Sequence, residues 1–268
     1  MRYIVDSNFL QSEELVKILL NPVNEVLLCD QVSLEALRSD MVKSFEVISR
    51  FPNQVHVLKR SQKIMRQSLK SKGLQKRLID ENDTKRFRKR CKQIHNLYRR
   101  DDYFHNQNKL MKQDSINELA QIQQAIDQMN EYIINYFSEL TKEQRKVLRK
   151  DPPFEPDALK LIMDRLLDMT WNLFSNVVDF KNRNNHETFY NSYLFRAGVC
   201  QYFLIQDLFL SGGLENMKSK KLLNDILDMQ IAGYATYFDG FLTNDRKAQR
   251  IYKISKYFID GVISAKYA

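Results

Sequence analysis

Glycine and proline are scarce in this chain, with seven and five among 268 residues. Sandwiches, barrels and disordered linkers are richer in both, so this scarcity disfavours those classes and favours a helix-rich protein. The three cysteines, Cys29, Cys91 and Cys200, are odd in number and widely spaced. They offer no Cys-x-x-Cys pair and no disulfide framework, which indicates a reducing compartment and predicts a cytoplasmic protein.

Several kinds of functional segment are also missing. There is no glycine-rich phosphate loop, so nucleotide hydrolysis is not expected. The four histidines have no i, i+4 pairing with each other, so no zinc site is expected. The amino terminus lacks the basic and apolar segments of a signal peptide, and the most apolar stretch, 193–210, contains charged residues. We therefore expect no secretion signal and no membrane association.

Short apolar segments alternate with helical segments near the start of the chain. Strands are expected at 2–5, 25–29 and 54–58, with helices at 12–20 and 33–50. This alternation is typical of βαβ units and predicts a parallel sheet. A helix at 220–236, followed by a short strand that ends before Thr243, would return the chain to that sheet.

The segment between residues 59 and 218 has only helical periodicity. Apolar residues recur at spacings of three and four from Leu119 to Leu140, which predicts a helix that packs along a neighbour. Thr141 and Gln144 form a capping-box pattern for the next helix. We therefore expect a core made of 1–58 and 219–268, split by a helical insertion at 59–218.

Positive charge is concentrated in one part of this insertion. Residues 59–112 contain 18 Lys and Arg against five Asp and Glu, a net charge of +13, whereas the whole chain carries +9. Aromatic residues are interleaved with these cations, which favours contact with nucleic acid. The candidate contacts are Lys85, Arg86, Arg88, Lys89, Arg90, Lys92, Arg99 and Arg100. A solvated helix face and binding of an acidic protein are the alternatives.

Acidic residues lie at the ends of the expected elements. Asp6 follows the first strand and Asp245 the last, so both are expected at the carboxyl edge of the sheet, where open parallel sheets bind ligands. Glu35 follows the second strand, and Asp228 begins a helical stretch, with Asp225 as its competitor. Carboxylates brought together repel each other unless a cation neutralises them, and oxygen ligands suit Mg²⁺ or Mn²⁺.

In this order the acids resemble the motifs of the PIN-domain (PilT N-terminus) nucleases. The motif positions are matched by Asp6-Ser-Asn8, Glu35, Asp228-x-x-Ile231-Ala232-x-x-Ala235 and Leu242-Thr243-x-Asp245. The resemblance covers 1–58 and 219–268 and does not extend to the 160 residues between them. It implies an α/β fold with a PIN-like, three-layer Rossmannoid core and a parallel sheet, interrupted by the large helical insertion.

The resemblance also implies a function. It implies a nuclease dependent on Mg²⁺ or Mn²⁺, acting on RNA more often than DNA and leaving a 5′-phosphate and a 3′-hydroxyl. Asp6, Asp228 and Asp245 would be metal ligands, and Glu35 a fourth ligand or the base that orients the attacking water. Asn8, Thr243 and Asn244 would position these groups or contact the substrate. A toxin-like or defence role fits the same resemblance.

Two other functions are compatible with the sequence. One is a non-catalytic nucleic-acid-binding or scaffold protein with a PIN-like fold. The other follows from Arg100-x4-His105, a spacing that resembles the active motif of the HEPN ribonucleases, which would need no metal. Nucleic acid, with RNA favoured, is the expected partner, and an inhibitory protein or a second copy of the chain is also compatible with the sequence.

Overall fold

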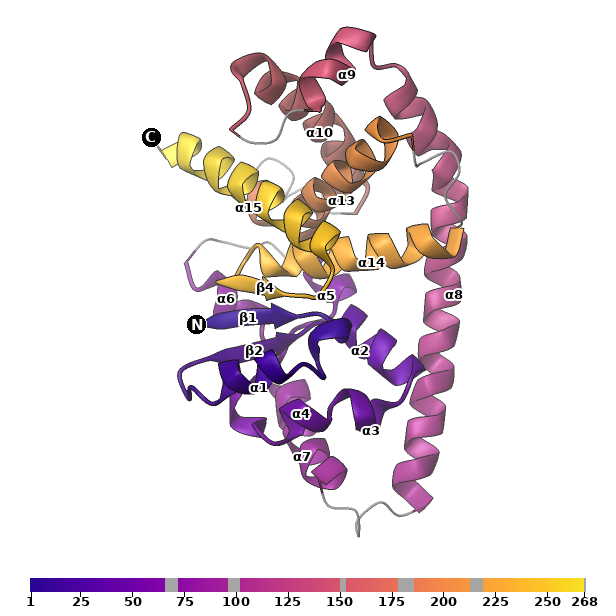
Figure 1. The fold of residues 1–268 in the computed structure, drawn as a ribbon, viewed down its shortest axis with the longest axis vertical. Coiled ribbons are helices and arrows are strands. Elements are labelled where there is room, and N and C mark those ends of the chain that lie inside the picture. The colour runs from indigo at the N-terminus through magenta and orange to yellow at the C-terminus, as the bar shows by residue number, and fades with distance from the viewer. Residues whose placement is uncertain (66–71, 96–101, 150–152, 178–185, 213–218, 268) are drawn as a thin grey trace.

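A four-stranded sheet lies within a mostly helical chain, so the fold belongs to the α/β class. The structure is a computed structural model and describes residues 1–65, 72–95, 102–149, 153–177, 186–212 and 219–267 (Figure 1). The strands are β1 (Arg2–Val5), β2 (Glu25–Leu28), β3 (Val55–Val57) and β4 (Gly240–Leu242). The strands predicted from the sequence are confirmed to within a residue or so at each end.

The sheet is parallel throughout, with the order β3-β2-β1-β4. Ile4 of the central strand β1 pairs with Leu27 on one side and with Phe241 on the other. The chain first moves outward from β1 through β2 to β3, and β4 is then added to the opposite edge of β1. The strand order therefore reverses between β1 and β4. Open parallel sheets bind ligands at the carboxyl ends of the strands at such a reversal.

The connections between the first three strands contain only short helices. They contain η1 (Ser7–Phe9), α1 (Glu13–Leu19), α2 (Asp30–Arg38), α3 (Met41–Ser44), α4 (Glu46–Ser49) and η2 (Pro52–Gln54). The continuous helix expected at 33–50 is wrong, because the chain breaks after α2. Asp40 caps α3 by accepting hydrogen bonds from the backbone N–H groups of Val42 and Lys43, at 3.0 and 3.2 Å. These breaks accompany the burial of Met41 and Phe45.

The described residues between 59 and 218 are predominantly helical, as predicted. The helices are α5 (Ser61–Met65), α6 (Leu74–Leu78), α7 (Glu81–His95), α8 (Asp102–Ser138), α9 (Lys142–Leu148), α10 (Pro156–Val177), α12 (His186–Asn191) and α13 (Tyr193–Leu210), and the last part of the chain adds α14 (Ser219–Ala235) and α15 (Arg246–Tyr267). The long helix α8 runs along one side of the molecule (Figure 1). It packs on α2 and α14, and Leu119 and Ile126 of the predicted apolar seam are buried. The capping box of Thr141 and Gln144 is also present.

One continuous apolar core joins the sheet to the helices of the middle segment. It contains Ile4 and Leu27 of the sheet as well as Phe137 and Phe195 of α8 and α13. Residues 59–218 therefore pack on the sheet-bearing part of the chain through shared side-chain contacts, and the proposed division into three parts stays a prediction. Among the residues that the structure describes, no helix is both long and apolar enough to cross a membrane.

Helices α13 and α14 lie very close together at Gly233. A Cβ atom at this glycine would lie only 2.8 Å from the Cα atom of Ala197. On either side of this point, the hydroxyl of Tyr193 donates to the carbonyl of Gln230 at 3.1 Å, and the guanidinium of Arg196 donates to the carbonyl of Thr236 at 2.9 Å. Helix α13 therefore fixes the position of the carboxyl-terminal half of α14.

We predict that Gly233→Ala destabilises the protein by about 1–3 kcal/mol, because the added methyl group would overlap the backbone of α13. Gly261→Ala is the matched control. Gly261 is exposed on α15 and nothing lies within 4 Å of the position of its Cβ, so alanine should stabilise that helix by up to about 1 kcal/mol. Urea unfolding of both variants measures the difference, and equal stability of the two would contradict the close contact at Gly233.

Candidate active site

Two of the predicted acids lie where the strand order reverses. Asp6 directly follows β1, and its backbone N–H donates to the carbonyl of Leu242 in β4 at 2.9 Å. Its side chain is almost completely buried. Asp245 follows β4 and caps α15, because its Oδ1 atom accepts from the N–H groups of Lys247 and Ala248 at 2.7 and 3.0 Å. The ends of β1 and β4 thus place both carboxylates at one edge of the sheet.

A network of polar side chains connects these two strand ends. The Oδ2 atom of Asp6 accepts hydrogen bonds from Asn8 Nδ2 at 2.6 Å and from Thr243 Oγ1 at 2.7 Å. The backbone N–H of Asn244 donates to Asn8 Oδ1 at 2.9 Å, and its Nδ2 atom donates to the carbonyl of Asn8 at 2.8 Å. The N–H of Asp245 donates to Thr243 Oγ1 at 3.1 Å. Of the three residues predicted to position the acids, Asn8 and Thr243 therefore contact Asp6 directly, and Asn244 contacts Asn8.

The other two acids come from helices on either side of this network. Glu35 lies in α2 and accepts a hydrogen bond from the hydroxyl of Ser7. Asp228 lies in the middle of α14, which begins at Ser219, so the expectation that Asp228 starts a helical stretch is wrong. Together with Asp6 and Asp245, both residues line one cavity of about 480 Å³. Asp6 and Asp245 are 239 residues apart in the sequence, yet all four acids converge in space.

Burial and mutual repulsion both disfavour ionisation of Asp6, Glu35 and Asp228. Burial, followed by the charges of Asp6, Glu35, Asp245 and Asp225, raises the pKa of Asp228 to about 8. Burial raises the pKa of Asp6, with Asp245 adding to the shift while a hydrogen bond from Thr243 opposes it. Burial also raises the pKa of Glu35, against a hydrogen bond from Ser7, and the charge of Asp6 raises it further. The cavity therefore favours bound positive charge.

Two cations that the sequence reasoning missed also line this cavity. They are Arg38 and Lys221, and Asp225 lies beside them. Arg38 follows Glu35 by three residues, and Lys221 precedes Asp228 by seven, so in each case helical periodicity puts the cation and the acid on one face. That spacing was the available signal. Asp225 itself pairs with Lys247 at 2.5 Å, whereas Asp228 has no ion-pair partner within the described residues, which favours Asp228 as the acid available to a ligand.

The chemistry of the donor set suits a hard divalent cation, because all four acids supply carboxylate oxygens. In the part of the chain that the structure describes, however, no group of three or more His, Cys, Asp or Glu residues is arranged to hold a metal ion. The side chains of Asp6 and Asp245 are instead engaged by hydrogen bonds from the protein. Metal binding by these acids stays a prediction.

The basic residues predicted to bind nucleic acid divide into two groups on α7. Arg88 and Arg90 are half-buried and hold α7 in place: Arg88 donates to the carbonyls of Asn53 and Val55 at 3.3 and 3.4 Å, and Arg90 donates to Asn108 Oδ1 at 2.8 Å. The exposed residues are Lys85, Arg86, Lys89 and Lys92. Arg99 and Arg100 lie outside the described residues, so the spacing between Arg100 and His105 is not tested in space.

We predict that Asp228→Asn stabilises the protein increasingly as the pH rises from about 4 to about 8. Asp228 keeps its proton in the folded chain up to a pH of about 8, while in the unfolded chain it ionises near pH 4. The unfolded state therefore binds fewer protons over this interval, and the wild-type protein loses stability with rising pH. Asparagine cannot ionise and removes this loss.

Thermal unfolding of the wild-type protein and Asp228→Asn at a series of pH values measures the effect. One pKa unit corresponds to about 1.4 kcal/mol, so even part of this shift should raise the midpoint of the variant by several degrees at pH 8. The two midpoints should coincide near pH 4. A constant difference across the range would show that Asp228 does not titrate in this way.

No protein-family model, curated protein or solved structure matches this chain. The resemblance of the motif residues to those of PIN-domain nucleases stays a prediction from the sequence.

Proposed function

We propose that this protein is a metal-dependent nuclease with a PIN-like core, acting on RNA. The observation that carries the proposal is the convergence of Asp6, Glu35, Asp228 and Asp245 on one cavity at the reversal point of the sheet. A group of four carboxyl groups around one cavity is costly to maintain, because like charges at close range disfavour each other's ionisation. Perturbed acids of this kind in a cavity are characteristic of functional sites.

The residues of the cavity would have different roles in binding and catalysis. Asp6, Asp228 and Asp245 would hold Mg²⁺ or Mn²⁺, which when bound polarises the scissile phosphate and lowers the pKa of a coordinated water. Glu35, with its raised pKa, would act as a further ligand or take a proton from the attacking water. Arg38 and Lys221 would bind the phosphates that flank the scissile bond, because both line the cavity beside the acids.

The preference for RNA comes from the family resemblance, as does a toxin-like or defence role. A non-catalytic nucleic-acid-binding or scaffold protein is the second candidate. The exposed cations of α7 favour it, since they would bind a phosphate backbone with or without cleavage. The two candidates differ in one measurable property, which is hydrolysis that depends on a divalent metal.

We predict that Asp6→Asn and Asp245→Asn each reduce cleavage by at least about 100-fold, because loss of a metal ligand removes several kcal/mol of transition-state stabilisation. Asparagine also caps helices well, so Asp245→Asn should leave α15 intact. The assay incubates the full chain with tRNA, single-stranded RNA and single-stranded DNA, with Mn²⁺ or with EDTA.

Asp260→Asn is the matched control for this assay. Asp260 is exposed on α15 and pairs with Lys256 at 3.1 Å, away from the cavity lining. This variant should cleave at the wild-type rate. Wild-type turnover in Asp6→Asn or Asp245→Asn would rule out the catalytic assignment, and cleavage that persists in EDTA would favour a metal-free ribonuclease.

We predict that combining Lys85→Gln, Lys89→Gln and Lys92→Gln weakens RNA binding without affecting metal binding. These side chains are exposed on α7, in the most basic part of the chain. Each phosphate contact that is lost on a single strand should flatten the slope of log affinity against log salt by about 0.7. Fluorescence anisotropy with labelled RNA over a range of salt concentrations measures both quantities.

The control removes the same charge from another surface. Lys142→Gln, Lys146→Gln and Lys160→Gln change three exposed lysines on α9 and α10. If α7 binds the strand, this control keeps the wild-type salt slope. If the two triple variants bind alike, the exposed face of α7 is a solvated or protein-binding surface.

A further inference from the structure

A second cavity, of about 330 Å³, lies on the other side of α2. Its walls come from α2, α3, the end of β3, α7 and α8. Much of the interior is apolar, with Phe45 and Phe87 in edge-to-face contact at 5.3 Å between ring centroids and with Met41 and Met111 beside them. Its volume falls in the range of small-molecule sites, and aromatic rings and methionine sulfur are favourable partners for a flat ring.

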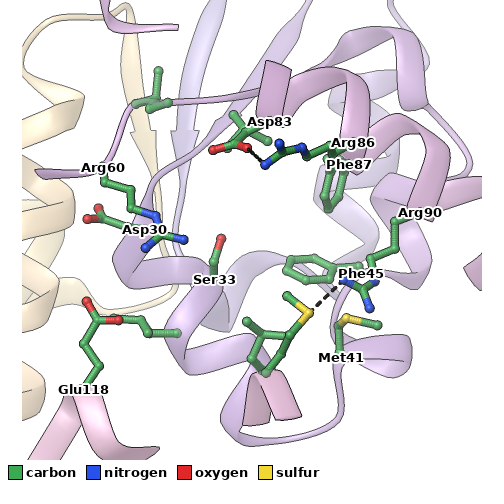
Figure 2. A pocket seen from close by; sticks show the side chains of 15 residues that line it. Asp30, Ser33, Met41, Phe45, Arg60, Asp83, Arg86, Phe87, Arg90 and Glu118 are labelled. Atoms are coloured by element: carbon green, nitrogen blue, oxygen red, sulfur yellow. Dashed lines mark hydrogen bonds and ion pairs between the residues drawn. The ribbon is translucent and has the colours of Figure 1, made fainter. Parts of the chain in front are cut away.

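Charged side chains surround this apolar interior. Figure 2 shows Arg60 and Glu118 on one side of the cavity and Phe45, Met41 and Arg90 on the other. Within the described residues, neither Arg60 nor Glu118 has an ion-pair partner. The other charged residues of the lining are already engaged. Arg86 pairs with Asp83 at 3.1 Å, and Asp30 accepts from the N–H and the hydroxyl of Ser61 at 2.8 and 2.7 Å.

The lining thus offers an apolar slot, an unused cationic donor and an unused anionic acceptor. A ligand that complements all three has a flat ring, N–H donors on that ring, and an anionic group. Phosphate suits the guanidinium of Arg60, which can form two parallel hydrogen bonds with it. The ring N–H groups suit the carboxylate of Glu118. A nucleotide has each of these parts.

Helix α2 separates this cavity from the acidic one. Ser33, Leu34 and Leu37 face the second cavity, whereas Glu35 and Arg38 line the acidic cavity. The lining of the second cavity includes none of the four acids, so a ligand can occupy it without touching them. Contact with α2 would nevertheless place that ligand one helix diameter from the residues proposed for catalysis.

We propose that this second cavity binds one nucleotide, with the base against Phe45, Phe87 and Met41 and the phosphate on Arg60. The nucleotide is either a free mononucleotide or one unit of a single strand that passes over α2. This site goes beyond the nuclease activity, because a nucleotide can bind here whether or not the acidic cavity cleaves a strand.

Isothermal titration calorimetry of the full chain with AMP, GMP, CMP and UMP, in EDTA, tests the proposal. Saturable binding of at least one of them is expected. Arg60→Gln should weaken it about tenfold, because a charge-assisted hydrogen bond to phosphate is lost. Leu37→Phe, which partly fills the cavity, should weaken binding too. If Leu37→Phe fails to fold, the binding measured for Arg60→Gln still tests the proposal, because Arg60 is exposed.

The control is Arg50→Gln, which changes an exposed arginine that lies in neither cavity lining. It should leave mononucleotide binding unchanged, while Arg60→Gln should leave metal binding unchanged. Displacement of the mononucleotide by a single-stranded oligonucleotide would show that the cavity binds one unit of a strand. The absence of displacement would show that the ligand is a free mononucleotide. No saturable binding by the wild-type chain, or equal binding by Arg60→Gln and Arg50→Gln, would overturn the proposal. A failure of the cleavage assay alone would leave it standing.

Discussion

The packing of α13 against α14 is the contact on which the site most depends. Because Gly233 has no side chain, α14 can approach Ala197 of α13 so closely that a Cβ atom at residue 233 would not fit. Arg196 reinforces this contact from a buried position, where its guanidinium lies 4.1 Å above the ring of Tyr237 as well as donating to Thr236. Asp228 is on the helix that is fixed in this way, so α13, which contains none of the four acids, holds one of them in position.

A second constraint is the electrostatic cost of the acidic cavity. The carboxyl groups lie together around one cavity at the carboxyl edge of the sheet, where burial and mutual repulsion raise the pKa values of Asp6, Glu35 and Asp228. Hydrogen bonds from Asn8 and Thr243 to Asp6 offset part of this cost, as does the start of α15 at Asp245. A ligand that brings positive charge would offset the rest of this electrostatic cost, and its binding would therefore stabilise the fold.

The helices between 59 and 218 contribute to both cavities in different ways. Helix α13 supports α14 behind the acidic cavity, while α7 and α8 supply Phe87, Met111 and Glu118 to the second one. Because α2 contributes to both linings, a ligand in the second cavity would contact the helix that contains Glu35. The middle segment is therefore part of the architecture of the sites as well as a source of basic surface.

By itself, the sequence determined the features that depend on neighbouring residues. Short apolar runs specified the parallel strands, Ser12 and Thr141 marked helix starts, and the acids at strand ends indicated one edge of the sheet. Tertiary contacts decided where α2 ends, that Asp228 lies in mid-helix, and that Arg88 and Arg90 anchor α7 while their neighbours face solvent. Local patterns in the sequence reflect the preferences of the backbone, but burial and pairing depend on which distant segments meet. The cavity on the far side of α2 forms only where five such segments come together.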